Sequence, residues 1–319
     1  MKLKLILLAC CFTALPLAAP AVVHAAAPMV KTQAPAYYRV MLGDFEITAL
    51  SDGTVKLPVD KLLKNISHRD IDRTLKYNYL DLPVETSVNG FLINTGSKLV
   101  LIDTGAGTFF GPTLGKLAAN LEAAGYRPEQ VDEIYITHMH PDHVGGLVSN
   151  GQRVFPNAVV RADQEDADFW LSADNLANAD AGHKGFFENA AAALKPYVDA
   201  GKFQPFSGNA ELAPGIRATV THGHTPGHSV YEVESKGQKM IVLGDLIHVG
   251  AVQFKRPNVA IGFDSDSPNA VKQRMRIFGK VAKEGDIAAA AHLSFPGLGH
   301  IRKTVGGYEW IPLNYQSAP

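Results

Sequence analysis

The stretch Thr137–Gly146 reads THMHPDHVGG and places three histidines and one aspartate within six consecutive positions. Imidazoles and a carboxylate buried so close together would be costly to desolvate, and protonated imidazoles would repel one another, unless a cation balanced them. Imidazole and carboxylate ligands without thiolate suit zinc or another first-row divalent ion. The stretch therefore predicts a metal site.

The residues before this stretch predict how the ligands are held. Val131–Ile136 is rich in β-branched and aromatic residues and is expected to be a strand that ends at the ligands. His138 and His140 lie two positions apart, so in an extended chain they face the same way. The following proline breaks the strand, and Asp142 and His143 open a glycine-softened turn towards a neighbouring position. We expect two adjacent metal ions.

Three later segments also end a predicted strand with a potential ligand. The turn at 221–228 reads THGHTPGH and offers three histidines, of which only some can be ligands. Asp245 follows an apolar run, and His292 follows the small apolar run Ile287–Ala291. Ligand sites in α/β sheets gather at the carboxyl ends of strands, so these segments are expected to meet the first cluster in one cleft.

The N-terminus predicts a secretory signal peptide over residues 1–25, with two early lysines, the apolar stretch Leu5–Leu17 and small residues before the cleavage point. A lipoprotein signal at Cys10 is the less favoured alternative. Both cysteines, Cys10 and Cys11, lie in this segment, so the mature chain is expected to have no disulfide and no thiolate ligand. We expect an exported protein, either periplasmic or secreted.

Charge and length limit the possible binding partners and the number of domains. The chain of 319 residues has 30 Lys and Arg against 31 Asp and Glu, and no run of basic residues stands out, so nucleic acid and membrane are not expected as partners. Residues 26–40 are rich in proline and alanine and predict an exposed N-terminal arm. Residues 41–319 are long enough for a single domain with one core.

The order of predicted elements indicates an α/β fold. Two strand-rich halves each carry helices at their flanks, which predicts an αββα sandwich of two mixed β-sheets covered by helices. Strands are expected at 45–50, 91–93, 99–102, 216–221, 229–234 and 239–243, and helices at 113–124 and 271–282.

With these motifs, the sequence resembles the metallo-β-lactamase superfamily. The resemblance implies two divalent ions, with zinc expected and manganese, iron or cobalt left open by the ligand types. It implies His138, His140 and His224 at one ion, Asp142, His143 and His292 at the other, and Asp245 as the bridge. His222 and His228 would then have supporting roles. Asp103 is expected either to accept a hydrogen bond from a ligand histidine or to be a turn residue.

A closer resemblance is to methyl parathion hydrolase and its relatives, which include dihydrocoumarin-type lactonases. It rests on the opening ITALSDG at 47–53 and on Phe110, Trp170 and Phe187, which would wall an apolar substrate pocket unless they are ordinary core residues. His248, Phe263 and Leu62 depart from the phosphotriester-cleaving relatives. A tetrahedral phosphotriester needs more room than a flat lactone, so these residues favour lactone opening, with phosphotriester hydrolysis as a side activity.

The implied mechanism uses a hydroxide held by the two ions, which lower the pKa of bound solvent to about 7. Asp142 and Asp245 would orient the ions and the solvent, and His248 would hydrogen-bond the substrate or simply form a wall. Alternatives are organophosphate hydrolysis as the main activity, an acyl-homoserine lactonase, a thioesterase, a β-lactamase, an iron oxidoreductase, or a non-catalytic metal protein. The arm and the resemblance favour a homodimer acting on a small ester or lactone.

Overall fold

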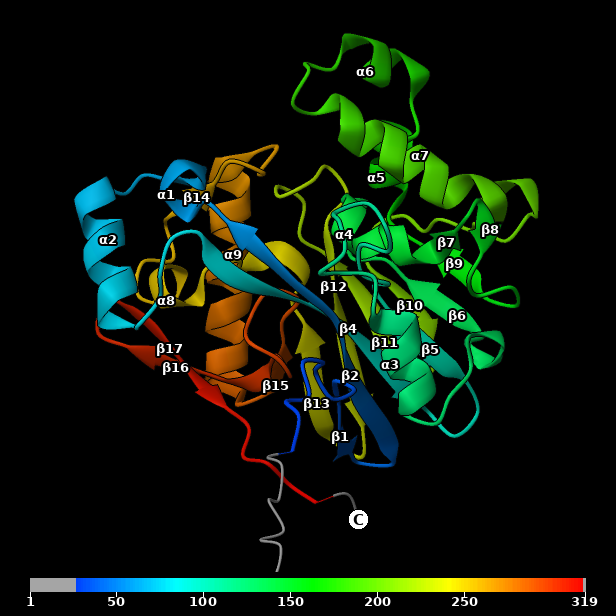
Figure 1. The fold of residues 1–319 in the computed structure, drawn as a ribbon, viewed down its shortest axis with the longest axis horizontal. Helices are drawn as coiled ribbons and strands as arrows, with labels where there is room; N and C mark the ends of the chain where they lie inside the picture. Colours follow the sequence, from blue (N-terminus) through cyan, green and yellow to red (C-terminus); the bar gives the residue numbers. More distant parts are fainter. Residues whose placement is uncertain (1–26, 318–319) are drawn as a thin grey trace, which may run out of the picture. The chain divides into compact units, whose positions relative to one another are not determined.

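The computed structural model describes residues 27–317. The predicted signal peptide lies outside the described residues. Residues 27–34 are described as a unit by themselves, and they are exposed and form neither helix nor strand. The remaining chain, from Pro35, carries all the elements drawn as arrows and coils in Figure 1.

The boundary of the predicted arm, 26–40, needs correction. Tyr37–Leu42 forms strand β1, which pairs antiparallel with β2 (Phe45–Leu57). Val40 and Leu42 are buried, whereas Met41 between them is exposed. This period of two places alternate side chains in the core, so residues 37–40 belong to the sheet.

Two mixed sheets form the centre of this unit. The first has the order β1-β2-β4-β5-β6-β9, with β4 at Val84–Asn94, β5 at Leu99–Ile102, β6 at Glu133–Tyr135 and β9 at Val159–Arg161. The second has the order β10-β11-β12-β13-β15-β16-β17, at Ala210–Ala213, Ile216–Val220, Ser229–Ser235, Gln238–Val242, Ile287–Ala289, Leu298–Thr304 and Gly307–Pro312. Most neighbouring strands are antiparallel, but β5, β6 and β9 run parallel, as do β13 and β15.

The sheets pack on each other and are covered by helices on their outer faces (Figure 1). In β5, Val100 and Ile102 lie in the core between the sheets, while Leu99 and Leu101 face the helix layer. That layer consists of α3 (Leu117–Ala123), α5 (Gln164–Trp170) and α7 (Lys184–Asp199). On the second sheet, α9 (Ser267–Glu284) forms the cover. The predicted αββα sandwich is confirmed.

Smaller elements fill the connections. The helices are α1 (Val59–Leu62), α2 (His68–Tyr77), α4 (Pro141–Val144), α6 (Ala173–Asn178) and α8 (Gly250–Gln253), with 3-10 turns at Pro128–Gln130, Gly145–Leu147 and Gly244–Leu246. The pairs β3 (Leu63–Lys64) with β14 (Ala260–Ile261), and β7 (Val148–Ser149) with β8 (Gln152–Arg153), form two short ladders. Among residues 27–317, no helix is long and apolar enough to cross a membrane.

Two helices differ in length from the sequence prediction. The helix predicted over 113–124 begins only at Leu117, because the preceding residues form a loop tied to Asp52. The second helix is longer than the apolar positions indicated. It starts after Asp266, whose side chain caps the Asn269 N–H, and ends at Gly285 with a φ of 74°.

Candidate metal centre

The predicted ligands lie at the carboxyl ends of strands that run in the same direction. In the first sheet, β6 is followed by the segment that carries His138, His140, Asp142 and His143. In the second sheet, β11, β13 and β15 are followed by His224, Asp245 and His292 respectively. Because β13 and β15 are parallel neighbours, Asp245 and His292 emerge side by side. The structure thus brings all seven residues to one edge of the sandwich.

One group of ligand atoms surrounds the Oδ2 atom of Asp245. His224 Nε2 lies 3.3 Å from this oxygen and His138 Nε2 lies 3.5 Å from it. His140 joins the group through Nδ1, which is 3.1 Å from His224 Nε2. In tetrahedral zinc sites with bonds of about 2.0–2.1 Å, the ligand atoms are roughly 3.3 Å apart. The four residues are therefore spaced to hold one such ion.

A second group surrounds the other oxygen of Asp245. His292 Nε2 and His143 Nε2 lie 3.1 and 3.2 Å from Asp245 Oδ1. Asp142 Oδ2 lies 3.4 Å from His292 Nε2 and 3.8 Å from His143 Nε2. Since one oxygen of Asp245 faces each group, its carboxylate has the position of a bridge between two ions.

Buried polar atoms without a hydrogen-bond partner support the same conclusion. His138 Nε2, His143 Nε2 and Asp245 Oδ1 are inaccessible to solvent and unpartnered. Such atoms are costly unless they meet a partner, and all three face the centre of the cluster. Imidazole nitrogens and carboxylate oxygens, without thiolates, fit zinc or another first-row divalent ion. The residues present therefore fit a pair of such ions.

The protonation of the histidines follows from burial and from Asp245. Burial lowers the pKa of His138 and His140 well below the usual value, so both are neutral and free to donate a lone pair. Burial also opposes a charge on His143, but Asp245 and then Asp103 outweigh it and raise its pKa. For His224, burial is likewise outweighed by Asp245, and its pKa rises to about 9. A cation would replace these protons.

Carboxylates behind the ligands orient two of the imidazoles. Asp103 Oδ2 lies 2.8 Å from His143 Nδ1, and its carboxylate also accepts the Thr137 N–H at 2.8 Å. Asp264 Oδ1 lies 2.9 Å from His224 Nδ1. Each contact leaves the Nε2 atom directed at Asp245, which is the arrangement that outer carboxylates impose on metal-bound histidines.

The other two histidines of the THGHTPGH turn are engaged elsewhere. His228 is buried, its Nδ1 lies 2.8 Å from the Thr221 hydroxyl, and its Nε2 accepts the Asp245 N–H at 3.0 Å. His222 is half-buried, with Nε2 at 3.3 Å from Asp163 Oδ2. Both therefore hold the turn in place, and His228 fixes the backbone of Asp245.

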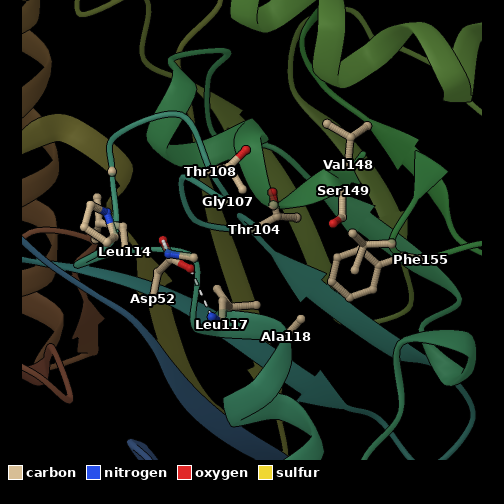
Figure 2. A pocket seen from close by; sticks show the side chains of 15 residues that line it. Asp52, Thr104, Gly107, Thr108, Leu114, Leu117, Ala118, Val148, Ser149 and Phe155 are labelled. Carbon is tan, nitrogen blue, oxygen red and sulfur yellow. Dashed lines mark hydrogen bonds between the residues drawn. The ribbon is translucent and has the colours of Figure 1, made fainter. Parts of the chain in front are cut away.

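A loop between β5 and α3 supports the ligand segment from behind. Asp52 accepts N–H bonds from Ala106, Gly115 and Leu117 at 2.9–3.0 Å, and Figure 2 shows the bond to Leu117 beside a cavity of about 420 Å³. The same loop donates the Thr104 N–H to the His143 carbonyl at 2.9 Å. Asp52 of the ITALSDG segment thus shapes the loop under His143.

Two supporting residues have no signal in the sequence. Asp166 in α5 is buried and accepts N–H bonds from Met139 at 2.8 Å and Gly227 at 2.6 Å, so it ties the two ligand loops together. Burial raises its pKa to about 6. Gln253 in α8 accepts the His248 N–H at 2.8 Å. Asp166 acts across long sequence separations and Gln253 across five residues, and neither lies in a motif that could have indicated the role.

The six predicted pocket residues have different surroundings. His248 Nε2 lies 2.9 Å from Asp245 Oδ2, and the Phe263 ring is 6.0 Å from the His248 ring. Trp170 packs edge-on against His140 at 5.3 Å, and Phe187 contacts Trp170 at 4.6 Å. The remaining two are Phe110, 36 % exposed on the loop after β5, and Leu62, half-buried at the end of α1.

One aromatic neighbour of the centre was missed from the sequence. Phe186 lies 5.1 Å from the His140 ring, at the start of α7. Its neighbour Phe187, which was predicted, is 4 % exposed and Trp170 is 3 % exposed. The adjacent FF pair was the available signal, and the helical geometry decides which of the two rings reaches the histidine.

Comparison with known proteins agrees with this geometry. An N-acyl homoserine lactonase from Bacillus sp is 27% identical over 71% of this chain and 88% of its own length. A crystal structure of the hydrolase AbOPH, described as in the beta lactamase superfamily, has 40% identity and a TM-score of 0.85 over 90% of this chain and all of its own. The dizinc quorum-quenching lactonase AidC has 28% identity and a TM-score of 0.82 over 88% of this chain and 99% of its own.

Residues 83–292, which include every predicted ligand, match the metallo-beta-lactamase superfamily. This match covers well over half of the chain. The ligand arrangement, the sandwich fold and the relatives agree on a metal-dependent hydrolase. The chain belongs to the metallo-beta-lactamase superfamily.

Proposed function

We propose that this hydrolase opens the ring of N-acyl homoserine lactones. The observation that carries the proposal is the joint occurrence of a two-ion ligand cluster and relatives that are N-acyl homoserine lactonases over most of their length. The AidC structure contains a bound product, N-hexnoyl-L-homoserine, in a protein that shares 28% of residues with this one. These relatives favour the acyl-homoserine lactone alternative over the dihydrocoumarin-type interpretation.

The proposed ligands are divided between two zinc ions. His138, His140 and His224 hold one ion, Asp142, His143 and His292 hold the other, and Asp245 bridges them, in keeping with the distances above. When bound, the ions supply a solvent nucleophile of lowered pKa and a Lewis acid for the ester carbonyl.

The protein's own residues position the substrate and exclude water. Six of the seven ligands are at most 6 % exposed, so the ester meets the centre where the Asp142 side chain, 18 % exposed, reaches the surface. His248 is buried, its Nδ1 has no hydrogen-bond partner, and its Nε2 faces Asp245 Oδ2 at 2.9 Å. We assign His248 to a hydrogen bond with the ester carbonyl or the departing ring oxygen, and Asp142 and Asp245 to orienting the reacting groups.

A second candidate function is hydrolysis of flat aryl lactones, with phosphotriesters as minor substrates. The contact of Phe263 with His248 favours it, because an aromatic wall next to the centre suits a planar ring.

One comparison of substrates tests both functions. The purified zinc-loaded enzyme is assayed on N-hexanoyl homoserine lactone, dihydrocoumarin and methyl paraoxon, with a metal-stripped sample as control. We expect the highest kcat/KM on the homoserine lactone and no activity without metal. A higher kcat/KM on dihydrocoumarin than on the homoserine lactone would favour the second function. The highest kcat/KM on methyl paraoxon would refute both proposed functions.

A further inference from the structure

A cavity of about 650 Å³ adjoins the metal centre on the side of His248 and His292. It lies among the segment that follows α2, helix α8, the loop after β15, and the hairpin of β16 and β17. Its size is within the range of small-molecule pockets, which is about 300–1,000 Å³. The Asp52 cavity is a separate space with different lining residues.

Two imidazoles belong to both the metal centre and the cavity. The rings of His248 and His292 stack at 5.2 Å with an interplanar angle of 16°. Their Nε2 atoms lie 2.9 and 3.1 Å from the two oxygens of Asp245, and the same two side chains line the cavity. A group that fills the cavity therefore lies against the imidazoles that flank the centre.

The lining of the cavity selects apolar groups. Leu80, Val84, Val249, Phe254, Leu293 and Trp310 contribute to its wall. The charged lining residues Glu85, Lys255 and Glu309 are exposed, so they belong to the rim. An alkyl chain would meet these apolar side chains inside, beside the polar side chains of Thr86, His248 and His292, with the charged groups where the cavity opens to solvent.

The aromatic residues on the opposite side of the centre leave little surface for such a chain. Trp170 contacts His140, Phe187 contacts Trp170, and the two rings are 3 and 4 % exposed. Their rings are already packed in the core under α7. Only Phe169 and Phe186 are half-buried among the aromatic rings of this group, and Phe186 is the one that contacts His140.

We propose that this cavity binds the acyl chain of the substrate, so that the enzyme prefers medium to long unbranched chains. The inference rests on the proposed lactonase function and adds the substrate class and its subsite. Each methylene that enters the cavity transfers apolar surface from water and is expected to raise kcat/KM by up to about fourfold, until the cavity is filled.

Filling the cavity tests the proposal. Ala251 in α8 is half-buried and lines the cavity, so A251F places a ring inside it. We expect A251F to lower kcat/KM at least tenfold for N-decanoyl homoserine lactone and less than twofold for N-butanoyl homoserine lactone. The matched control is A192F, at an exposed position of α7, with both rates unchanged. An equal loss on both substrates, or no loss on either, would overturn the proposal.

A binding measurement separates this inference from the proposed function. The chain has two tryptophans, and Trp310 lines the cavity, so W170F leaves one fluorescent reporter there. Titration of metal-free W170F with N-decanoyl homoserine is expected to shift the Trp310 emission saturably, and the shift is expected to be lost in W170F/A251F. A saturable shift without any lactone hydrolysis would refute the function but support the cavity. Lactone hydrolysis without a shift of the Trp310 emission would support the lactonase function and refute the binding of the acyl chain in the cavity.

Discussion

Asp245 has the most constrained side chain of the centre. Its two oxygens face different groups of ligands, its N–H is held by His228, and it is 3 % exposed. Burial opposes its charge, but His292, His143 and His248 outweigh that effect and keep its pKa well below the usual value. It therefore remains a carboxylate, which is the form that can bridge two cations.

At the residue scale, Asp103 is expected to control one of the two ions. Removing its carboxylate in D103A leaves His143 Nδ1 without its partner, and such losses lower metal affinity by about 10- to 100-fold. The affinity of the ion held by Asp142, His143 and His292, measured by competition with a chelator, should fall by this factor. The group of His138, His140 and His224 serves as the internal control, because its ion should keep its affinity. Unchanged affinity for both ions would mean that Asp103 only shapes the turn.

His248 is the second residue whose role can be separated by substitution. H248L removes the unpartnered Nδ1 and the Nε2 that faces Asp245, and it is expected to lower kcat/KM for lactones about tenfold, with the phosphotriester rate unchanged or raised. Metal content by atomic emission should stay at two ions per chain. Loss of an ion would show that His248 is a ligand, since it lies within reach of Asp245 and His292. Unchanged rates for both substrates would exclude it from the mechanism.

The sequence was informative about the ligands and poor about their supports. His138, His140 and Asp142 stand in one short motif, so their types and spacing alone indicated a metal site. Asp166 and Asp264 contact the ligand loops through folding, with no local pattern around them. The pocket was predictable in part, because contacts such as Phe186 with His140 depend on how α7 is placed.

At the element scale, short strands are enough to place the metal ligands. Each of β6, β11, β13 and β15 is followed directly by a segment that carries one or more ligands. The strand predicted over 131–136 is only Glu133–Tyr135, and the two histidines lie beyond it in extended chain. Continuous apolar runs predicted β5 and the end of β13 well, since Leu99–Ile102 and the last three residues of β13 are buried on both faces. The loop before α3 could not be foreseen, because it depends on Asp52 from a distant strand.

Glu133 in β6 links three elements and gives a prediction on pH. Burial alone would raise its pKa, but hydrogen bonds from Lys98, Tyr135 and Arg161 outweigh this effect and lower it. A lowered pKa adds stability above the unfolded value near 4.5, and this stability is lost as the pH falls through the folded value. E133Q should therefore lower the free energy of unfolding by about 1–3 kcal/mol at neutral pH, and by less in acid.

Urea unfolding of both proteins between pH 7 and about pH 3.5 checks this expectation. The exposed variant E188Q in α7 is the control and should match the natural protein at every pH. If the free energies of unfolding of E133Q and the natural protein differ by the same amount at every pH, the charge of Glu133 does not contribute to stability and only the shape of its side chain does.

At the scale of the whole molecule, the two ions are expected to hold the sheets together. The ligands come from both sheets, so binding occurs only in the folded state and adds to stability by mass action. With free zinc about a thousandfold above Kd, one ion contributes roughly 4 kcal/mol, and chelation should lower Tm by about 10 °C. Calorimetry before and after chelation, with zinc added back as control, measures the shift. An unchanged Tm would mean that the apo fold is already complete.

Assembly and export stay predictions at this scale. We propose a homodimer, and sedimentation at micromolar concentration is expected to give twice the mass of the mature chain. The same run with residues 26–36 deleted should give monomer if the arm contributes to the contact. Only monomer for the full mature chain would refute the dimer. Export concerns residues 1–25, and the N-terminus of the mature protein, read by mass spectrometry, is expected at residue 26 or 28.

The distribution of ligands along the chain has a consequence for biosynthesis. The first ligand, His138, follows β6 of the first sheet, and the last, His292, follows β15 of the second. A nascent chain that has released only its first half can offer an incomplete set of donors, and the second ion cannot be captured until β15 has docked beside β13. Binding of both ions therefore requires that both sheets have folded. The metal bound is expected to be the one available in the compartment where the last strands fold.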